Sequence, residues 1–252
     1  MTGTVKLVAA AWVLGTLALL VFPLVGVDPQ ARLYYSNAMQ TLTSLGSAAV
    51  CFHAMRAFPS ESPLRRVWGA IGLGVLAWGL GATIFAGFPL LNGGAETPYP
   101  YYSDVGYLAT PVLIIVGLVL FKRSIGMETP VWGQVLSGLV FFGFLVLAYK
   151  ANAEGLVDPS PAMKATAFGY TVFDPALMAT TILTATSFRG GEVAKSWWYV
   201  VAGIILYFIA NQLYTYLLSV EQYATGHPID IGWMLGFGLI AWAAMKTRSL
   251  VS

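Results

Sequence analysis

Long apolar stretches recur along the whole chain, separated by short segments that carry most of the charged side chains. The hydrocarbon core of a membrane requires about 20 apolar residues per helix. Eight stretches lie near that length: Val5–Val25, Leu33–Phe58, Val67–Leu90, Val105–Phe121, Val131–Tyr149, Ala165–Phe188, Trp197–Leu218 and Ile229–Met245. The pattern predicts a single all-α integral-membrane domain over residues 1–252, a polytopic bundle with eight transmembrane helices.

The basic residues give this bundle an orientation. If the N-terminus is cytoplasmic, all but three of the 13 Lys and Arg residues lie on the inner side, the exceptions being Arg32, Lys150 and Lys164. Cytoplasmic segments of membrane proteins carry an excess of Lys and Arg. We therefore expect both termini in the cytoplasm and a multi-pass protein of the inner (cytoplasmic) membrane.

The even-numbered stretches form a degenerate repeat. Each has an acidic or amide residue near its start, Asn37, Asp104, Asp174 or Asp230, and its first basic residue follows after 19, 18, 15 or 16 positions. At 1.5 Å per residue these separations match about one hydrocarbon thickness. The repeat predicts four helical hairpins, with the four residues at one depth near the outer boundary.

Composition limits the classes of function. Hydrophobic residues make up 58% of the chain and charged residues 10%, where a soluble domain has roughly 25% charged. The lipid bilayer is therefore the expected solvent, and a net charge of +2 without a basic run excludes a nucleic-acid partner. One cysteine and two histidines exclude an internal disulfide and a thiolate metal cluster, and the sequence leaves the cofactor and any other metal open.

Two interpretations of the outer aspartates remain open. Asp and Asn are good helix N-caps, and a carboxylate there also meets the positive end of the helix dipole. Ionisable residues at the boundary of a membrane bundle also indicate a site. We expect Ser103 to cap its helix, which would leave the Asp104 carboxylate free to point into the bundle.

Aromatic and amide side chains accompany the aspartates. Asn211 and Tyr214 share one face of the seventh stretch, and an amide so deep in an apolar helix needs a partner that lipid does not provide. Hydrogen bonding between helices and an interfacial aromatic belt are the alternatives to a pocket. The site hypothesis has a cation or polar headgroup bound by three aspartates and shaped by aromatic and amide groups: Asp104, Asp174, Asp230, Tyr107, Trp78, Asn211 and Tyr214.

One segment resembles a known family. Trp78-Gly79 in the third stretch is followed by Pro98-Tyr99-Pro100-Tyr101-Tyr102-Ser103-Asp104 and by Tyr107. This is similar to the Trp-Gly pair and the Pro-x-Pro-Ser-x-Asp-x-x-Tyr pattern of the integral-membrane input domains of prokaryotic sensor histidine kinases and diguanylate cyclases, although Tyr102 stands where the pattern has a small residue. The resemblance implies a sensor domain, which we expect to stand alone without an output domain.

Three classes of function follow. The leading one is a non-enzymatic sensory or ligand-binding membrane module, with no catalytic residues. The second is a structural or accessory subunit that has protein partners in the membrane, in a complex carrying pigment, haem or quinone on other chains. The third is a small transporter or a lipid-handling enzyme. The sequence has no Gly-x-Ser-x-Gly for a serine nucleophile and no His-Glu-x-x-His for zinc.

Overall fold

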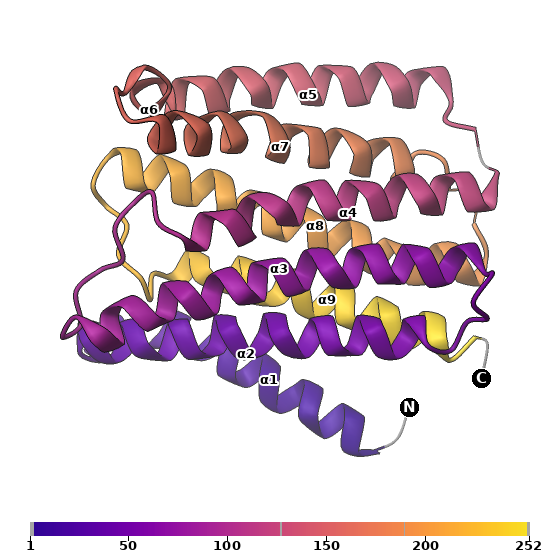
Figure 1. Cartoon of the computed structure of the whole chain (residues 1–252). Coiled ribbons are helices and arrows are strands. Elements are labelled where there is room, and N and C mark those ends of the chain that lie inside the picture. Colours follow the sequence, from indigo (N-terminus) through magenta and orange to yellow (C-terminus); the bar gives the residue numbers. More distant parts are fainter. Residues whose placement is uncertain (1–2, 127, 189, 251–252) are drawn as a thin grey trace.

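The computed structural model describes residues 3–126, 128–188 and 190–250, and these ranges are helical without a strand. Within these ranges, eight helices of 18 residues or more follow one another in antiparallel order (Figure 1). They are α1 (Gly3–Val21), α2 (Pro29–Met55), α3 (Pro63–Leu91), α4 (Ser103–Ile125), α5 (Val131–Ala151), α7 (Pro161–Ala185), α8 (Gly191–Ser219) and α9 (Ile231–Arg248). The short helix α6 (Ala153–Val157) and the 3₁₀ turn η1 (Pro228–Asp230) lie between them.

Each of the eight predicted apolar stretches forms one long helix, and the short elements α6 and η1 were not predicted. Within the described ranges, five helices are long and apolar enough to cross a membrane: α3, α4, α5, α8 and α9. Helix α2 is also long, but its buried face is polar and includes Ser36, Gln40 and Ser44. Length and composition together therefore make this a multi-pass membrane protein.

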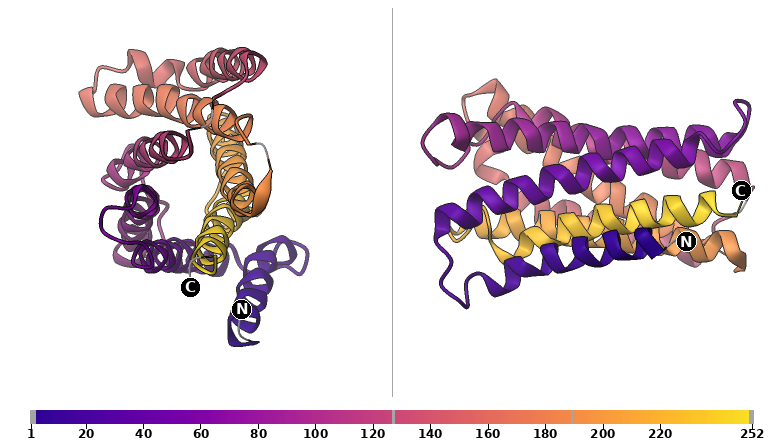
Figure 2. Two further views of the ribbon diagram at one scale, coloured as in Figure 1. Left: turned by 90° about the vertical axis from the view of Figure 1, so that its right-hand side faces the viewer. Right: turned by 90° about the horizontal axis from the view of Figure 1, so that it is seen from below.

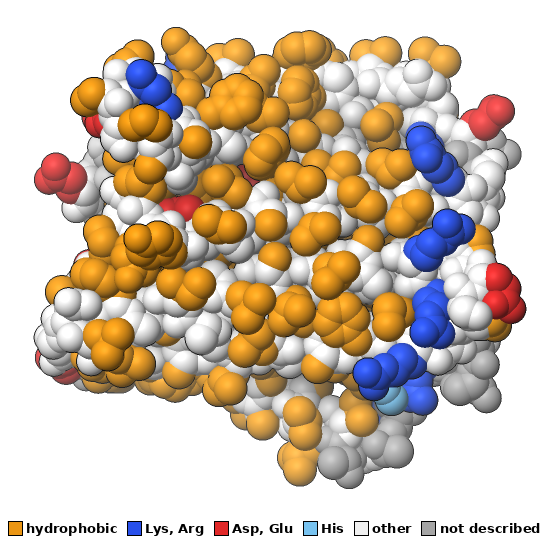
Figure 3. Space-filling view, in the orientation of Figure 1, with side chains coloured by type: hydrophobic (Ala, Val, Ile, Leu, Met, Phe, Trp, Pro, Cys, Tyr) orange, Lys and Arg blue, Asp and Glu red, His pale blue; other side chains and the backbone are white. Residues whose placement is uncertain are grey.

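The two ends of the bundle differ in charge. We call the end where α4 and α9 begin the aspartate end, because Asp104 and Asp230 lie there, and the opposite end the basic end. Helix α4 finishes at the basic end with Lys122 and Arg123 in its last turn. Lys and Arg side chains gather at this end of the visible face, and hydrophobic side chains cover its middle (Figure 3). Arg189, expected at the end of the sixth span, lies outside the described residues.

Contacts between neighbouring helices close six of the described helices into a ring, which is seen end-on in Figure 2. Contacts connect α2 to α3, α3 to α4, α4 to α7, α7 to α8, α8 to α9, and α9 back to α2. Helix α5 packs outside α7, and α1 lies outside the ring against α2 and α9. The chain-terminal ends of α1 and α9 both lie toward the basic end (Figure 1).

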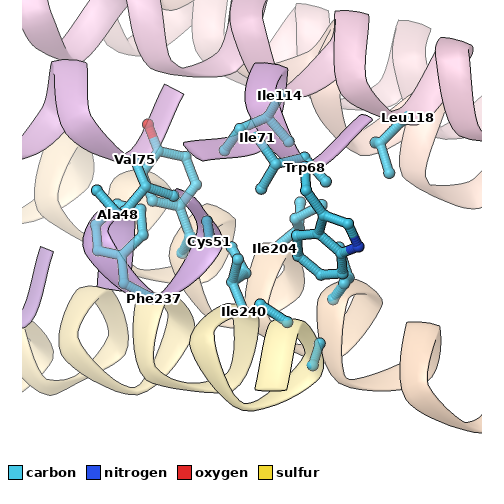
Figure 4. Close-up of a cluster of buried hydrophobic side chains, with 14 of the residues drawn as sticks. Ala48, Cys51, Trp68, Ile71, Val75, Ile114, Leu118, Ile204, Phe237 and Ile240 are labelled. Atoms are coloured by element: carbon cyan, nitrogen blue, oxygen red, sulfur yellow. The ribbon is translucent and has the colours of Figure 1, made fainter. Parts of the chain in front are cut away.

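Apolar side chains fill the ring from its middle toward the basic end (Figure 4). Trp68, Phe121 and Trp197 are fully buried, and the Phe121 and Trp197 rings stack with centroids 3.4 Å apart. Such a core leaves few voids larger than a water molecule. These packed rings therefore fill the middle of the described bundle on its basic side.

Small residues bring α8 and α9 into close contact. A Cβ on Gly203 would lie 2.5 Å from the carbonyl oxygen of Gly236, and one on Gly236 would lie 2.7 Å from that of Gly203. A Cβ on Gly232 would lie 2.7 Å from the Ala210 Cβ. Gly232 and Gly236, four residues apart, form a small-xxx-small pair that allows α8 and α9 to pack this closely.

Candidate ligand-binding site

A cavity of about 430 Å³ opens at the aspartate end of the ring. Its wall comes from α2, α3, α4, α7, α8 and α9, with the end of α5, α6 and the segment before α4 at its edge. This volume falls within the range of small-molecule sites. Aromatic rings make up much of the wall, among them Trp78, Tyr99, Tyr107, Tyr170, Tyr214 and Trp233.

Five of the seven predicted site residues line this cavity: Trp78, Asp104, Tyr107, Asn211 and Tyr214. Asp174 and Asp230 lie outside the lining and are 3% and 0% exposed. The structure therefore brings the predicted aromatic and amide groups together around Asp104. It places the other two aspartates in the packing behind the wall.

Asp104 is held by two hydrogen bonds and is 7% exposed. Its Oδ2 accepts from the backbone N–H of Tyr101 over 2.7 Å, and its Oδ1 accepts from the Tyr170 hydroxyl over 2.6 Å. The expectation that Ser103 caps α4 is wrong, because α4 has no side-chain cap and Asp104 itself reaches back to the preceding backbone, as in a capping box. A carboxylate has about four acceptor positions, so Asp104 can also accept from a ligand.

Asp174 belongs to a network that joins three helices. Its Oδ2 accepts from the Asn211 side-chain amide over 2.9 Å, and the Asn211 Oδ1 accepts from the Trp233 indole N–H over 2.6 Å. Polar groups surrounded by lipid must find such partners within the protein. The network therefore supports the interhelical interpretation of Asn211, whose side chain also lines the cavity.

Asp230 connects α2 to the loop before η1. Its carboxyl group accepts from the Ser36 hydroxyl over 2.6 Å, the Gly226 backbone N–H over 2.9 Å and the Tyr223 hydroxyl over 3.0 Å. Tyr223 lies in the loop, where burial, followed by the charge of Asp230, raises the pKa of its hydroxyl well above the usual value. Asp230 is therefore a structural connection between segments distant in the sequence.

Ring contacts support the predicted common depth. Trp78 packs against Tyr107 and Trp233, with centroids 5.1 and 6.1 Å away, and these residues follow Asp104 and Asp230 by three positions each. Asp104 and Asp230 therefore lie at one level.

The other two residues of the repeat lie close to that level. Asn37 is adjacent to Ser36, which binds Asp230. Asp174 follows Tyr170, the partner of Asp104, by four residues, which places it about 6 Å further along the bundle. The contacts therefore agree with the expected depth to within about one turn.

The three aspartates do not form a joint metal centre. In the ranges that the structure describes, no group of three or more His, Cys, Asp or Glu side chains is placed to hold a metal ion. Each aspartate instead binds its own protein donors. In the described part of the chain, Asp104 forms no ion pair with Lys150 or Lys164. The partners of Asp104 are instead a backbone amide and a tyrosine hydroxyl.

Several lining residues were not predicted. Gln40 lies on α2 with its Nε2 bonded to the Ser36 hydroxyl, four residues earlier, and Ser44 follows four residues later. This four-residue spacing of polar groups in an apolar stretch was the available signal. Lys150, Glu154 and Asp158 also line the cavity, from the end of α5 to just after α6. They belong to a polar connection whose position over the cavity depends on the tertiary fold.

The charge around the cavity is mainly negative. Asp104, Glu154 and Asp158 line it together with one basic residue, Lys150. Acidic atoms are visible between hydrophobic side chains at the aspartate end in Figure 3. Tyr99 lies on the segment before α4, where burial and then the charge of Asp104 raise the pKa of its hydroxyl. A cavity with this lining favours positively charged ligands over anions.

Comparisons of the chain with protein families, with curated proteins and with solved structures find no match.

Proposed function

We propose that all eight long helices cross the inner membrane, with both termini in the cytoplasm and the aspartate end facing outward. The polar residues that lower the hydropathy of α2 and α7, such as Gln40, Ser44 and Thr181, are buried within the bundle. The Lys and Arg residues at the end of α4 and of α9 support a cytoplasmic basic end.

In this orientation the chain acts as a non-enzymatic ligand-binding and sensory module with its site at the outer-leaflet level. The observation that carries the proposal is the aromatic cavity around Asp104, whose size suits a small molecule. A packed core around Trp68, Phe121 and Trp197 lies between this cavity and the basic end. Such a core favours holding a ligand over passing one through the membrane.

The resemblance to membrane input domains supports the sensory role. Trp78, Asp104 and Tyr107, which carry that resemblance, all line the cavity, and the Trp78 and Tyr107 rings are in contact. A ligand here would touch α4, α8 and α9 together. It would thereby favour one arrangement of these helices over another, which is the requirement for transmitting a signal.

A cavity-filling variant tests this function. Thr215 lines the cavity, whereas Leu213, two residues earlier on α8, is 43% exposed on the outside of the fold. We expect Thr215→Phe to block binding and Leu213→Phe to preserve it. The measurement is a thermal-shift screen of a metabolite library on the purified full chain, since a ligand at 100 times its Kd stabilises by about 2.7 kcal/mol.

The proposal requires compounds that raise the Tm of the wild type and of Leu213→Phe but leave Thr215→Phe unchanged. Compounds that stabilise all three proteins equally bind elsewhere. A screen giving only such compounds, or none, would count against a site in the cavity.

A further inference from the structure

We propose, on the basis of the ligand-binding function above, that the cavity takes an organic ammonium ion with an apolar body, which packs against the aromatic wall with Asp104 as its counter-charge. The inference combines the size of the cavity, the chemistry of its wall and its charge. These are separate observations that exclude different ligands.

The size of the cavity excludes a bare metal ion as its occupant. About 430 Å³ is far more than one ion fills. The described residues also provide no cluster of three or more metal-binding side chains. The occupant is therefore a molecule with a body of its own.

The wall supplies faces suited to a cation. Trp78 packs against both Tyr107 and Trp233, and Tyr214 packs against Trp233 with centroids 5.7 Å apart. Ring faces attract ammonium groups, most strongly where water is excluded, and cages of several rings bind quaternary ammonium ions. The same rings provide apolar area for the remainder of the ligand.

The charge of the cavity lining favours a cationic ligand over a neutral ring compound. Asp104 lines the cavity and is almost completely buried, so a cation beside it is little screened by solvent. The Gln40 Nε2 donates to the Ser36 hydroxyl, which leaves the Gln40 Oε1 as a further acceptor at the wall. Glu154 and Asp158 outnumber Lys150 at the same cavity and attract cations toward it. An anion would meet repulsion from these carboxylates.

Four small probes test the proposal on the full chain by isothermal titration calorimetry. Choline and 3,3-dimethyl-1-butanol have the same shape but differ in charge, benzyltrimethylammonium adds an apolar ring, and benzenesulfonate is an anion. We expect choline to bind about tenfold or more tightly than its neutral analogue. Benzyltrimethylammonium should bind most tightly, and benzenesulfonate should not bind.

Two pairs of variants test whether the cation binds in the cavity. Asp104→Asn should weaken binding of benzyltrimethylammonium about tenfold or more, whereas Asp28→Asn, which removes a charge at the N-cap of α2 outside the cavity lining, should not. Tyr214→Leu removes a ring face and should weaken binding, and Tyr214→Phe should retain it. The Tyr214 pair keeps the test informative if Asp104→Asn does not fold.

The outcomes are distinct from those of the metabolite screen. Binding of the neutral or anionic probe as tightly as the cations, with loss in Thr215→Phe, would overturn the ammonium assignment and leave the cavity as a ligand site. No binding of either cation would also overturn it, whatever the metabolite screen shows. Cation binding that is unchanged in both Asp104→Asn and Tyr214→Leu would place it outside this cavity and refute the proposal.

Discussion

The aspartates of α4, α7 and η1 occupy similar places in the repeat but differ in the number of hydrogen bonds they accept. Asp230 accepts three and is completely buried, Asp104 accepts two beside the cavity, and Asp174 accepts one from Asn211. A buried donor left without its acceptor costs about 1–3 kcal/mol. Asp230 is therefore the most firmly bonded of the three, and Asp104 is the one that the proposed ligand site uses.

Replacing Asp230 should destabilise the protein more than replacing Asp104. An asparagine at position 230 keeps one acceptor oxygen and turns an N–H₂ group toward the Ser36 or Tyr223 hydroxyl. We expect Asp230→Asn to lower the free energy of unfolding by about 2–4 kcal/mol and Asp104→Asn by about 1–2 kcal/mol. Thermal unfolding of both variants in detergent measures the difference. Equal, negligible shifts would mean that these aspartates act only as helix caps.

His227 should make stability depend on pH. Its Nδ1 accepts from the Ile229 N–H over 3.2 Å, and burial together with the Arg32 charge lowers its pKa. A pKa lowered by folding stabilises the protein above the unfolded value, about 6.5, and this stabilisation is lost as pH falls through the folded-state pKa. Between about pH 7.5 and about pH 5.5 the Tm of the wild type should fall more than that of His227→Asn, which can cap η1 without titrating. The same change of Tm with pH in the wild type and in His227→Asn would contradict the assignment of this pH dependence to His227.

At the scale of the helix, the length of the apolar stretches predicted the helices, whereas the positions of polar residues did not predict their hydrogen-bond partners. Each long helix follows from its apolar run, but the partner of Asn211 was not predictable, because it depends on how α7, α8 and α9 are rotated in the bundle. Ser103 was misassigned as a cap because an Asp that follows it can reach the same backbone donors.

The contact between α8 and α9 should not tolerate a methyl group. A Cβ on Gly236 meets the Gly203 carbonyl at 2.7 Å, so Gly236→Ala should cost about 1–3 kcal/mol of stability through overpacking. Gly87 lies within α3, where a Cβ would have nothing within 4 Å, so Gly87→Ala should be neutral or stabilising by up to about 1 kcal/mol. Thermal unfolding compares the stability of the two variants. Equal losses of stability would contradict tight packing of α8 against α9 at Gly236.

At the scale of the whole molecule, the sequence predicted the number of long helices and their charge asymmetry but not the ring. The cavity forms because α2, α3, α4, α7, α8 and α9 close on one another, and chain order alone does not determine that α2 contacts α9. Five of the seven proposed residues nevertheless line it, because these aromatic and amide residues lie near the same end of the bundle as Asp104. The residues around α6 were missed because their position depends on that closure.

Membrane orientation can be tested with introduced cysteines, because the single native cysteine, Cys51, is fully buried. Ser60 is exposed in the loop between α2 and α3, and Ala95 is exposed between α3 and α4. In cells with a permeabilised outer barrier and an intact inner membrane, an impermeant maleimide should label Ala95→Cys but not Ser60→Cys. Lysis should expose both sites, and the reverse labelling pattern would refute the proposed topology.

The most direct test of the central claim, that the aromatic cavity at the aspartate end holds a small molecule, is an experimental structure of the full chain with benzyltrimethylammonium. We expect density for the ligand between Trp78, Tyr107 and Tyr214, with its ammonium group near Asp104. A cavity filled by its own side chains, or ligand density only elsewhere on the protein, would contradict the claim.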